Sequence, residues 1–395
     1  MEREKLWTKA FTATSIVNFV LMLSMYLLLV TMAGYAMETY GSTTSMGGFV
    51  ASVFIIGALI GRLYAGKKIT QIGAKRILLI GIFIFIIMSF IYYMAIGVYG
   101  LIVVRVVQGI GLGFATTATG TIVSQVIPQS RNGEGISYFS ISIVLSAAIG
   151  PLIGIELVQT LGYTSIFIFS TIIGLISLLL ALPLQVPVIE ADESTEKGRG
   201  SILNQLFEKN AIPISIVLLI VALGYAGILS FITSYAEEIG LAEVGGFFFL
   251  VYAVVVLLTR PFTGKLMDLK GANIISYPGL LLFAAGMLLL AIANSVFLFL
   301  LSAVLIGLGY GNFQSCTQAI AIKLTPIERM GLANSTYFIF LDFALGIGPL
   351  LLGFIEPVLG YRGMYGGLVV VILVGLVFYY ILHGRKDAEL LEIEK

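Results

Sequence analysis

Residues 101–114 read LIVVRVVQGIGLGF, an apolar run that contains one arginine, one glutamine and three glycines at alternate positions. An arginine inside hydrocarbon costs about 2.5–3.5 kcal/mol on insertion scales, so we expect Arg105 to face protein or a water-filled cavity. Gly109, Gly111 and Gly113 do not form a nucleotide-binding loop, because no strand precedes them. The segment therefore predicts a closely packed membrane helix with a polar group inside it.

The same segment has a counterpart 198 residues later, which marks an internal duplication. The residues that recur at this offset are Gly307, Gly309, Gly311, Pro326, Arg329, Gly331 and the pair Gly348-Pro349. Arg105 and Gln108 do not recur, because Ala303 and Ile306 stand at their positions. An even number of spans in each repeat keeps the orientation, so we expect parallel repeats with a cavity between them at mid-membrane.

Composition places the whole chain in a membrane. Of its 395 residues, 59% are hydrophobic and 11% are charged, whereas soluble domains carry about 25% charged residues. Apolar runs long enough to cross ~30 Å of hydrocarbon recur from end to end, and we count twelve of them. The sequence therefore predicts an all-α polytopic protein with twelve transmembrane helices in two pseudo-symmetric bundles of six. The apolar run near the amino terminus is too long for a cleaved signal, and we expect it to stay as a signal anchor.

One long polar stretch, residues 186–210, divides the spans into two sets of six. We therefore expect an N-terminal bundle over residues 1–185, a linker over 186–210, a C-terminal bundle over 211–383 and a tail over 384–395. Lysine and arginine gather at both termini and in the links after even-numbered spans, which by the positive-inside rule predicts cytoplasmic termini. The expected location is the cell membrane.

Three ordered motifs resemble those of the major facilitator superfamily. They are the loop Gly66-x6-Gly73 with Lys75 and Arg76, the fourth-helix run Arg105-x2-Gln108-Gly109, and the fifth-helix run Gly150-Pro151-x2-Gly154. The third motif is typical of the 12-span drug/proton antiporter branch of that family. The resemblance covers the whole chain and implies the fold of the family, with transport by alternating access.

The loop motif departs from the family pattern in the first half of the chain. The family usually has an acid four residues after the first glycine, and Thr70 stands there. The second half retains the acid as Asp268, four residues after Gly264. The resemblance therefore implies that a charge-paired cytoplasmic latch is weakened in the first half.

Other residues are candidates for gating. Proline removes a backbone donor in mid-helix, so Gly150-Pro151 and Gly348-Pro349 are expected to bend the fifth and eleventh spans. Bends in symmetry-related helices suit a rocking mechanism. Glu134 opens the fifth span and has two interpretations: an acid that favours the helix dipole, or a gate ion pair with Lys75 or Arg76.

Two ionisable residues inside spans are the candidates for proton coupling. Asp342 lies near the middle of the eleventh span, where desolvation favours the protonated carboxyl group. The arginine that matches Arg105 in families that this sequence resembles is implicated in proton coupling. The alternatives are structural: a permanent bond across helices for Asp342, and an arginine that holds carbonyl groups of a neighbouring helix for Arg105. Many drug/proton antiporters have an acid in the first span, and Asn18 stands here instead, which shifts coupling to Asp342 or weakens the case for coupling.

Polar and aromatic side chains on the spans expected to line the cavity form the candidate cargo site. They are Asn18, Tyr26, Gln108, Thr116, Tyr225, Asn312, Gln314, Gln318 and Tyr337. The plainer interpretation of such residues is helix-to-helix hydrogen bonding or core packing, and for Asn18 it is the favoured one.

The leading hypothesis is a proton-coupled antiporter that exports amphipathic small molecules or drugs. The alternatives are dedicated export of a metabolite, such as an opine-type metal chelate or a sugar, and a membrane enzyme. An enzyme needs clustered catalytic groups, and with one histidine and one cysteine we expect no enzymatic activity, no cofactor and no metal site. The net charge of +1 gives no basic field for nucleic acid. The expected partners are a small-molecule substrate, protons and the lipid bilayer, and we expect a monomer.

Overall fold

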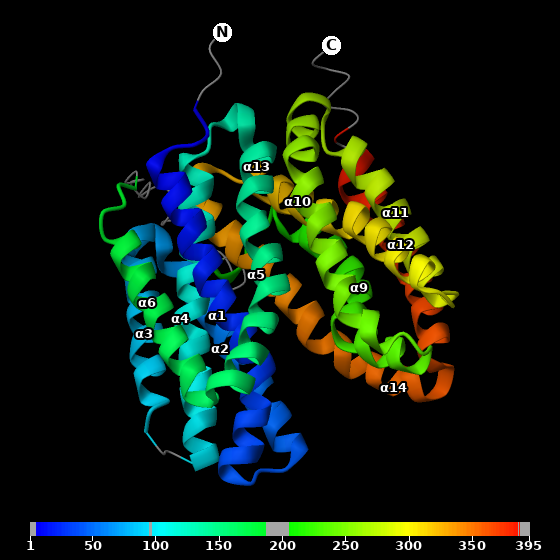
Figure 1. Ribbon diagram of the computed structural model, residues 1–395. Coiled ribbons are helices and arrows are strands. Elements are labelled where there is room, and N and C mark those ends of the chain that lie inside the picture. Colours follow the sequence, from blue (N-terminus) through cyan, green and yellow to red (C-terminus); the bar gives the residue numbers. More distant parts are fainter. Residues whose placement is uncertain (1–4, 95–96, 187–204, 386, 388–395) are drawn as a thin grey trace. The chain divides into compact units, whose positions relative to one another are not determined.

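A computed structural model describes residues 5–94, 97–186, 205–385 and 387 (Figure 1). Every regular element within these residues is a helix. Eleven helical segments among them are long and apolar enough to cross a membrane. The last segment contains Gly360, whose φ of 65° and ψ of 169° interrupt the helix. The predicted all-α membrane fold is confirmed, and this interruption accounts for the twelfth predicted span.

The long helices follow the order of the repeat. In the first half they are α1 (Lys9–Tyr40), α2 (Thr44–Ile72), α3 (Ala74–Ile91), α4 (Gly97–Val126), α5 (Asn132–Leu161) and α6 (Tyr163–Ala181). In the second half they are α9 (Ile212–Glu238), α10 (Gly245–Lys270), α11 (Asn273–Ala291), α12 (Val296–Ile306), α13 (Asn312–Lys323) and α14 (Met330–Tyr379). Two π-helices interrupt this pattern, η3 (Gly307–Gly311) between α12 and α13 and η5 (Tyr380–Gly384) after α14.

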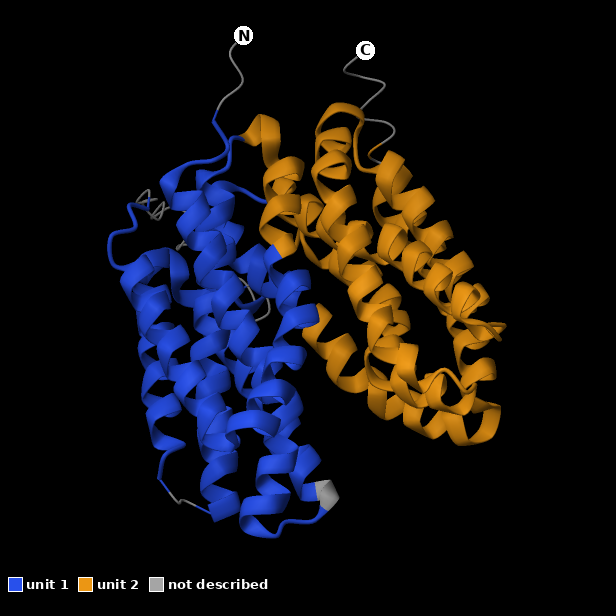
Figure 2. Cartoon of the chain, viewed as in Figure 1, with its two compact units in different colours: residues 1–128, 142–208, 325–339 blue, residues 129–141, 209–324, 340–395 orange. Residues whose placement is uncertain are grey.

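The chain packs into two compact units (Figure 2). Unit 1 comprises residues 1–128, 142–208 and 325–339, and unit 2 comprises residues 129–141, 209–324 and 340–395. The start of α14 therefore belongs to unit 1, and the start of α5 belongs to unit 2. The bundle limits expected from the sequence remain a prediction, and the predicted linker and tail fall largely outside the described residues.

Glycines bring α4 into close contact with two neighbouring helices of unit 1. A side chain at Gly109 would overlap the carbonyl oxygen of Phe54 in α2, and a Cβ at Gly111 would lie 2.8 Å from the carbonyl oxygen of Gly81 in α3. Buried apolar side chains of α2, α3 and α4 fill the rest of this contact. Small residues drive helix association in lipid because they let backbones approach, so the alternating glycines are packing residues, as predicted.

Candidate functional site

Arg105 is fully buried in unit 1 and holds α4 to α2. Its Nε donates to the carbonyl oxygen of Val50 at 3.3 Å, and its Nη2 donates to that of Ala51 at 2.9 Å. The guanidinium carbon lies 4.6 Å from the centre of the Phe54 ring, a cation–π contact that is stronger away from water. These contacts match the structural alternative for Arg105, an arginine that holds carbonyl groups of a neighbouring helix.

The buried network of Arg105 continues into α3. Arg105 Nη1 donates to Gln108 Oε1 at 3.2 Å, and the Tyr92 hydroxyl donates to the same oxygen at 2.6 Å. Gln108 Nε2 lies 3.5 Å from the hydroxyl of Ser89. Gln108 therefore makes its hydrogen bonds inside unit 1, and its place in a cargo cavity stays a prediction. The second repeat has no such network at these positions, because Ala303 and Ile306 are apolar.

Arg105→Ala is expected to lower the free energy of unfolding and to abolish transport together. The substitution removes hydrogen bonds from a charged donor and leaves Gln108 and Tyr92 with fewer partners, which costs about 1.5–3 kcal/mol. Thermal unfolding in detergent and transport in proteoliposomes measure the two effects. Val103→Ala is the control, because Val103 lies on α4 and is 61% exposed. Lost transport with an unchanged unfolding temperature would contradict the structural role and favour proton coupling.

Two further candidates for the cargo site bond helices together within unit 1. Asn18 Nδ2 donates to Ser142 Oγ at 2.8 Å, and Thr119 Oγ1 donates to Asn18 Oδ1 at 3.0 Å. These bonds join α1 to α5 and α4. Thr116 Oγ1 accepts from Nη1 of Arg62 in α2 at 3.0 Å. The helix-to-helix interpretation of Asn18 is the one that these contacts favour, and Thr116 follows it.

Two polar candidates of the second half, Asn312 and Gln318, also make hydrogen bonds between helices, here within unit 2. Asn312 Nδ2 donates to Thr259 Oγ1 at 3.0 Å, and Thr263 Oγ1 donates to Asn312 Oδ1 at 2.9 Å. Gln318 Oε1 accepts from Ser140 Oγ at 3.2 Å. Each of these bonds joins the tenth span to another helix. The amide groups thus have internal partners, and contact with cargo stays a prediction for both.

An aromatic stack lies beside the π-helix η3 of unit 2. The ring centroids of Tyr225 and Tyr310 are 4.3 Å apart, with an interplanar angle of 17°. The ring centroid of Tyr252 lies 5.5 Å from that of Tyr225. Tyr310 and Tyr252 are buried, and Tyr225 is half-buried. Single-turn π-helices occur frequently at functional sites. Tyr225 is the member of this stack that is not fully buried, and its contact with cargo stays a prediction.

The remaining candidates differ in exposure. Tyr26 and Gln314 are half-buried, and Tyr337 is fully buried with its ring edge against Phe338. Asp342 lies in the part of α14 that belongs to unit 2 and is half-buried. The role of Asp342 in proton coupling stays a prediction.

Asp268 holds the start of α5 in unit 2. Its carboxylate accepts from the backbone N–H of Gly133 at 2.7 Å and from that of Glu134 at 2.9 Å. The Glu134 carboxylate lies 2.8 Å from Arg131 Nε and 3.6 Å from Lys265 Nζ. Glu134 therefore has two cationic partners within unit 2, and the pair with Lys75 or Arg76, which lie in unit 1, stays a prediction. An acid at the first amide groups of a helix also complements the helix dipole. We call these five residues the α5 anchor.

The start of α14 is held in unit 1 by a contact of different chemistry. Thr70 stands at the position of Asp268, and its hydroxyl donates to the carbonyl oxygen of Glu328 at 3.0 Å. Glu208 adds two contacts: its N–H donates to Thr336 Oγ1 at 2.8 Å, and its carboxylate lies 2.5 Å from Arg329 Nε. We call these five residues the α14 anchor. The loss of the acid from the first loop motif thus leaves a neutral hydrogen bond where the α5 anchor has a carboxylate.

The sequence did not identify Glu208 as a functional residue. Arg329 repeats Arg131, but the position that corresponds to Glu134 is Leu332, so the second repeat lacks the acid three residues after the arginine. This missing acid was the available signal that Arg329 needs a partner from elsewhere in the chain. The partner comes from the described end of the predicted linker.

Glu208→Gln is expected to loosen the α14 anchor. Glu208 is 4% exposed and Arg329 is 33% exposed in their side chains, so solvent screens the pair only partly, and we expect a loss of about 1–2 kcal/mol. The unfolding temperature should fall, and it should fall less for Glu237→Gln, because Glu237 is exposed. Equal unfolding temperatures for Glu208→Gln and the wild type would show that the pair contributes nothing.

Two predicted gating glycines, Gly66 and Gly264, allow a close helix contact within each unit. A Cβ at Gly66 would lie 2.5 Å from Ser335 Cβ at the start of α14, and one at Gly264 would lie 2.7 Å from the carbonyl oxygen of Gly133. The repeated glycines of the loop motif therefore let each anchor form. Gly73 and Gly271 close the turns that follow, with φ of 93° and 83°, a region that favours glycine.

The prolines of the predicted bends lie inside their helices, Pro151 in α5 and Pro349 in α14. The glycine before each proline approaches a neighbouring helix of its own unit. A Cβ at Gly150 would lie 2.8 Å from Tyr26 Cβ in α1, and one at Gly348 would lie 2.6 Å from Ala226 Cβ in α9. Each pair therefore combines a missing backbone donor with a close helix contact.

The family model of the Major Facilitator Superfamily matches residues 14–278 and 246–395. The chain is 27% identical to an uncharacterized MFS-type transporter of Methanocaldococcus jannaschii over 92% of this chain and 96% of that protein. It is 24% identical to the staphylopine export protein of Staphylococcus aureus over 85% of this chain and 87% of that protein. It is 25% identical to the riboflavin transporter RibZ of Clostridioides difficile over 75% and 77%.

Among solved structures, the human organic anion transporter MFSD10 shares the fold with a TM-score of 0.76. It is 14% identical in sequence, and the similarity covers 94% of this chain and 98% of that one. The family match, the relatives and the shared fold agree with one another. The chain therefore belongs to the Major Facilitator Superfamily, and it is a multi-pass membrane transporter and not an enzyme.

Proposed function

We propose that this transporter is a proton-coupled antiporter of the cell membrane that exports a small molecule by alternating access, with both termini in the cytoplasm. The observation that supports it best is the pair of anchors. Helices α5 and α14 each belong to both units, and the start of each is held by a few polar contacts. Such contacts break and re-form at low cost, which suits an element with two discrete arrangements.

Asp342 is the residue that we assign to proton coupling. It lies in α14, the same helix whose start forms the α14 anchor. A carboxylate in the hydrocarbon layer is costly, and a proton removes that cost by neutralising it. Protons from outside would favour the return step, and cytoplasmic cargo would compete with the proton. Arg105, with its bonds to α2, is proposed to position α4 and to contribute to coupling only through that packing.

The cargo that we propose is an amphipathic small molecule. The half-buried Tyr225, backed by Tyr310 and Tyr252, presents an aromatic surface of the kind that binds ligands with an apolar body. Dedicated export of a defined metabolite is the second candidate. Two relatives carry the names of single compounds, staphylopine and riboflavin, and these names support this second candidate.

Substrate-induced proton movement in proteoliposomes with an imposed pH gradient tests this function. The panel comprises lipophilic cations, neutral drugs, metal-chelating opines, riboflavin and sugars. Movement with several unrelated cations supports a multidrug antiporter, and movement with one compound supports a dedicated exporter. Saturable uptake of any panel member without proton movement would overturn the coupling. Liposomes without protein and liposomes treated with a protonophore are the controls.

A further inference from the structure

The second repeat has polar or aromatic side chains at five positions where the first repeat has small or apolar ones. The second-repeat residues are Thr259, Thr263, Asn312, Tyr225 and Tyr310, and at the offset of 198 the first repeat has Gly61, Ala65, Phe114, Leu27 and Leu112. The five residues come from three spans, yet in unit 2 they gather around the π-helix η3. A difference confined to one place in two copies of a scaffold indicates a task that only the second copy performs.

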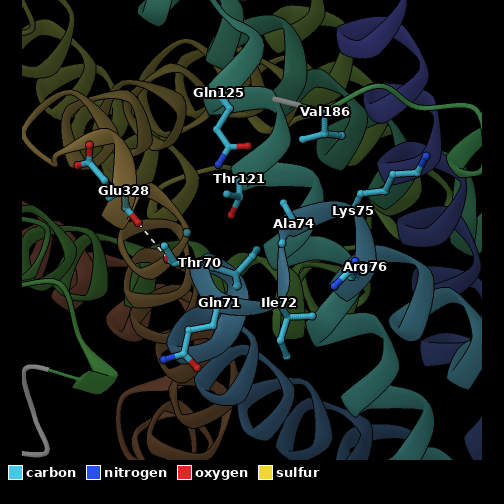
Figure 3. A pocket seen from close by; sticks show the side chains of 13 residues that line it. Thr70, Gln71, Ile72, Ala74, Lys75, Arg76, Thr121, Gln125, Val186 and Glu328 are labelled. Atoms are coloured by element: carbon cyan, nitrogen blue, oxygen red, sulfur yellow. Dashed lines mark hydrogen bonds between the residues drawn. The ribbon is translucent and has the colours of Figure 1, made fainter. Parts of the chain in front are cut away.

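The backbone differs between the repeats at the same place. Span ten changes from α-helix to π-helix over Gly307–Gly311, although no residue is inserted, because the offset of 198 holds for these glycines and for Pro326 beyond them. The corresponding span of the first repeat, α4, is one continuous α-helix, and the cavity of about 360 Å³ that it borders lies farther along, at Thr121 and Gln125 (Figure 3). Since π-helices are rare and the length of the chain does not force this one, the contacts around it stabilise it.

Two side chains bond to carbonyl groups of the π-helix. Arg260 Nη2 donates to the carbonyl oxygen of Gly311 at 2.9 Å, and Asn312 Nδ2 donates to that of Leu308 at 2.9 Å. The backbone N–H of Asn312 donates to the carbonyl oxygen of Gly309 instead. Inside a membrane every backbone acceptor needs a partner from the protein, so these two side chains favour the π conformation.

Two threonines of α10 fix the orientation of the Asn312 amide group. Asn312 Nδ2 donates to Thr259 Oγ1 at 3.0 Å as well as to Leu308, and Asn312 Oδ1 accepts from Thr263 Oγ1 at 2.9 Å. Asn312 and Arg260 are both buried, and hydrogen bonds are electrostatically stronger in such an interior than in water. We call Thr259, Arg260, Thr263 and Asn312 the π clamp.

The π clamp surrounds the residue that carries the aromatic stack. Tyr310 lies inside η3 and stacks on Tyr225, and Tyr252 of α10 stacks on Tyr225 as well. A side chain at Gly311 would overlap Val256, so the π-helix lies directly against α10. A change from π to α hydrogen bonding would rotate the Tyr310 side chain relative to the rest of the span and separate it from Tyr225. We call Tyr225, Tyr252 and Tyr310 the tyrosine platform.

We propose that the π clamp positions the tyrosine platform and that the platform selects cargo with a planar aromatic ring. Tyr225 is half-buried while Tyr252 and Tyr310 are buried, so Tyr225 presents the platform to a ligand. A planar ring suits this surface because aromatic rings pair in offset stacks. The clamp residues act through Tyr310 and do not need to touch the cargo. This selection rests on the proposed function, in which Tyr225 contacts cargo, whereas the positioning of Tyr225 does not.

A fluorine label on Tyr225 tests the positioning without any cargo. Fluorotyrosine is incorporated at this position of the full-length protein in nanodiscs, where its fluorine resonance carries the ring-current shift of the stacked Tyr310. Asn312→Leu keeps nearly the same shape but removes the amide group, and we expect it to abolish that shift. Thr263→Val removes one bond of the π clamp and should give a smaller change in the same direction. Ser302→Ala is the matched control, because the buried Ser302 hydroxyl of the same span bonds within its own helix.

The same label at Tyr92, which is buried in unit 1, separates a local change from a loss of the fold. Its resonance should be the same in every variant. If Asn312→Leu moves the resonances of both labels, that variant is misfolded and Thr263→Val decides the question. A Tyr225 resonance that stays at its wild-type position in the folded variants would overturn the positioning by the π clamp.

Transport kinetics in proteoliposomes test the selection of cargo. For aromatic members of the panel, Asn312→Leu should raise KM by about threefold to tenfold, as expected for the loss of one aromatic contact, with little change in the maximal rate. KM for a non-aromatic member such as a sugar should stay at the wild-type value. Equal changes in KM for both classes, or a fall in the maximal rate alone, would reduce the π clamp to a contact that only holds helices together.

The wild type alone also tests the two proposals separately. Transport of non-aromatic members only would overturn the selection by the tyrosine platform and leave the proposed export function standing. Transport of no panel member would contradict the proposed function, and the fluorine resonances would still decide whether the π clamp positions Tyr225.

Discussion

Asp342→Asn is expected to abolish proton-coupled transport while the folded protein accumulates at the wild-type level. Asparagine has nearly the same shape as aspartate and keeps its hydrogen-bonding oxygen, but it does not bind a proton. The cost of an ionised group at this depth is about 2.5–3.5 kcal/mol, and coupling uses this difference between the two protonation states. Without this difference in free energy between the protonated and ionised side chain, the number of protons moved in each transport cycle falls by about 100-fold or more.

The measurement is cargo-induced proton movement in proteoliposomes, made together with the exchange of labelled for unlabelled cargo. Exchange needs no net proton transfer, so it should persist in Asp342→Asn while proton movement disappears. Glu156→Gln is the matched control, because Glu156 is an exposed acid at the far part of α5. Unchanged proton movement in Asp342→Asn would remove Asp342 from the mechanism. Loss of both proton movement and exchange would make it a structural residue.

The features that the sequence predicted correctly depend on local or repeated patterns. The apolar runs gave the spans, the glycines of α4 gave close packing, and the offset of 198 residues matched the equivalent helices of the two halves. Hydropathy does not tell which side of a helix faces a given neighbour, because each residue turns the side chain by about 100°. The sequence therefore predicts cavity positions for Gln108 and Asn312 but not their hydrogen-bond partners, which lie on neighbouring helices.

The contacts that the sequence did not predict join residues that are far apart in the chain. Glu134 pairs with Lys265, and Glu208 with Arg329. Neither pair follows from spacing along one helix, because each depends on how α5 and α14 divide between the two units. The acid of the loop motif is one feature from which the sequence predicted part of such a long-range contact. Its loss at Thr70 and its retention at Asp268 predicted unequal latches, and the two anchors differ in chemistry at those positions.

Asp268→Asn is expected to release the start of α5. The carboxylate accepts two backbone hydrogen bonds, from Gly133 and Glu134, and bonds to a charged acceptor contribute about 1.5–3 kcal/mol. Asparagine keeps an acceptor oxygen but loses the charge that complements the helix dipole. The equilibrium between the anchored and the released start should therefore shift by about 10- to 100-fold. Asp268→Glu keeps the charge, and its equilibrium between the anchored and the released start should lie between those of the wild type and Asp268→Asn.

A cysteine in place of Ser137 reports this release. Ser137 lies in α5, is 3% exposed, and its hydroxyl would be 2.7 Å from a Cβ at Gly264, so a thiol there reacts with a maleimide only when the anchor opens. The natural Cys316 is buried and is replaced by serine in this background. Asp268→Asn should raise the rate of modification of the reporter in proportion to the shift in equilibrium.

Thr70→Val is the matched variant in the other repeat, read with a cysteine in place of Ser335, which is also buried. It removes one neutral hydrogen bond, worth about 0.5–1.5 kcal/mol, and leaves the pair of Glu208 and Arg329 in place. We therefore expect the smaller increase in modification for Thr70→Val. If modification increases equally or more for Thr70→Val, the carboxylate of Asp268 does not make the α5 anchor stronger than the α14 anchor. The control of opening would then lie with α14 and the linker end at Glu208.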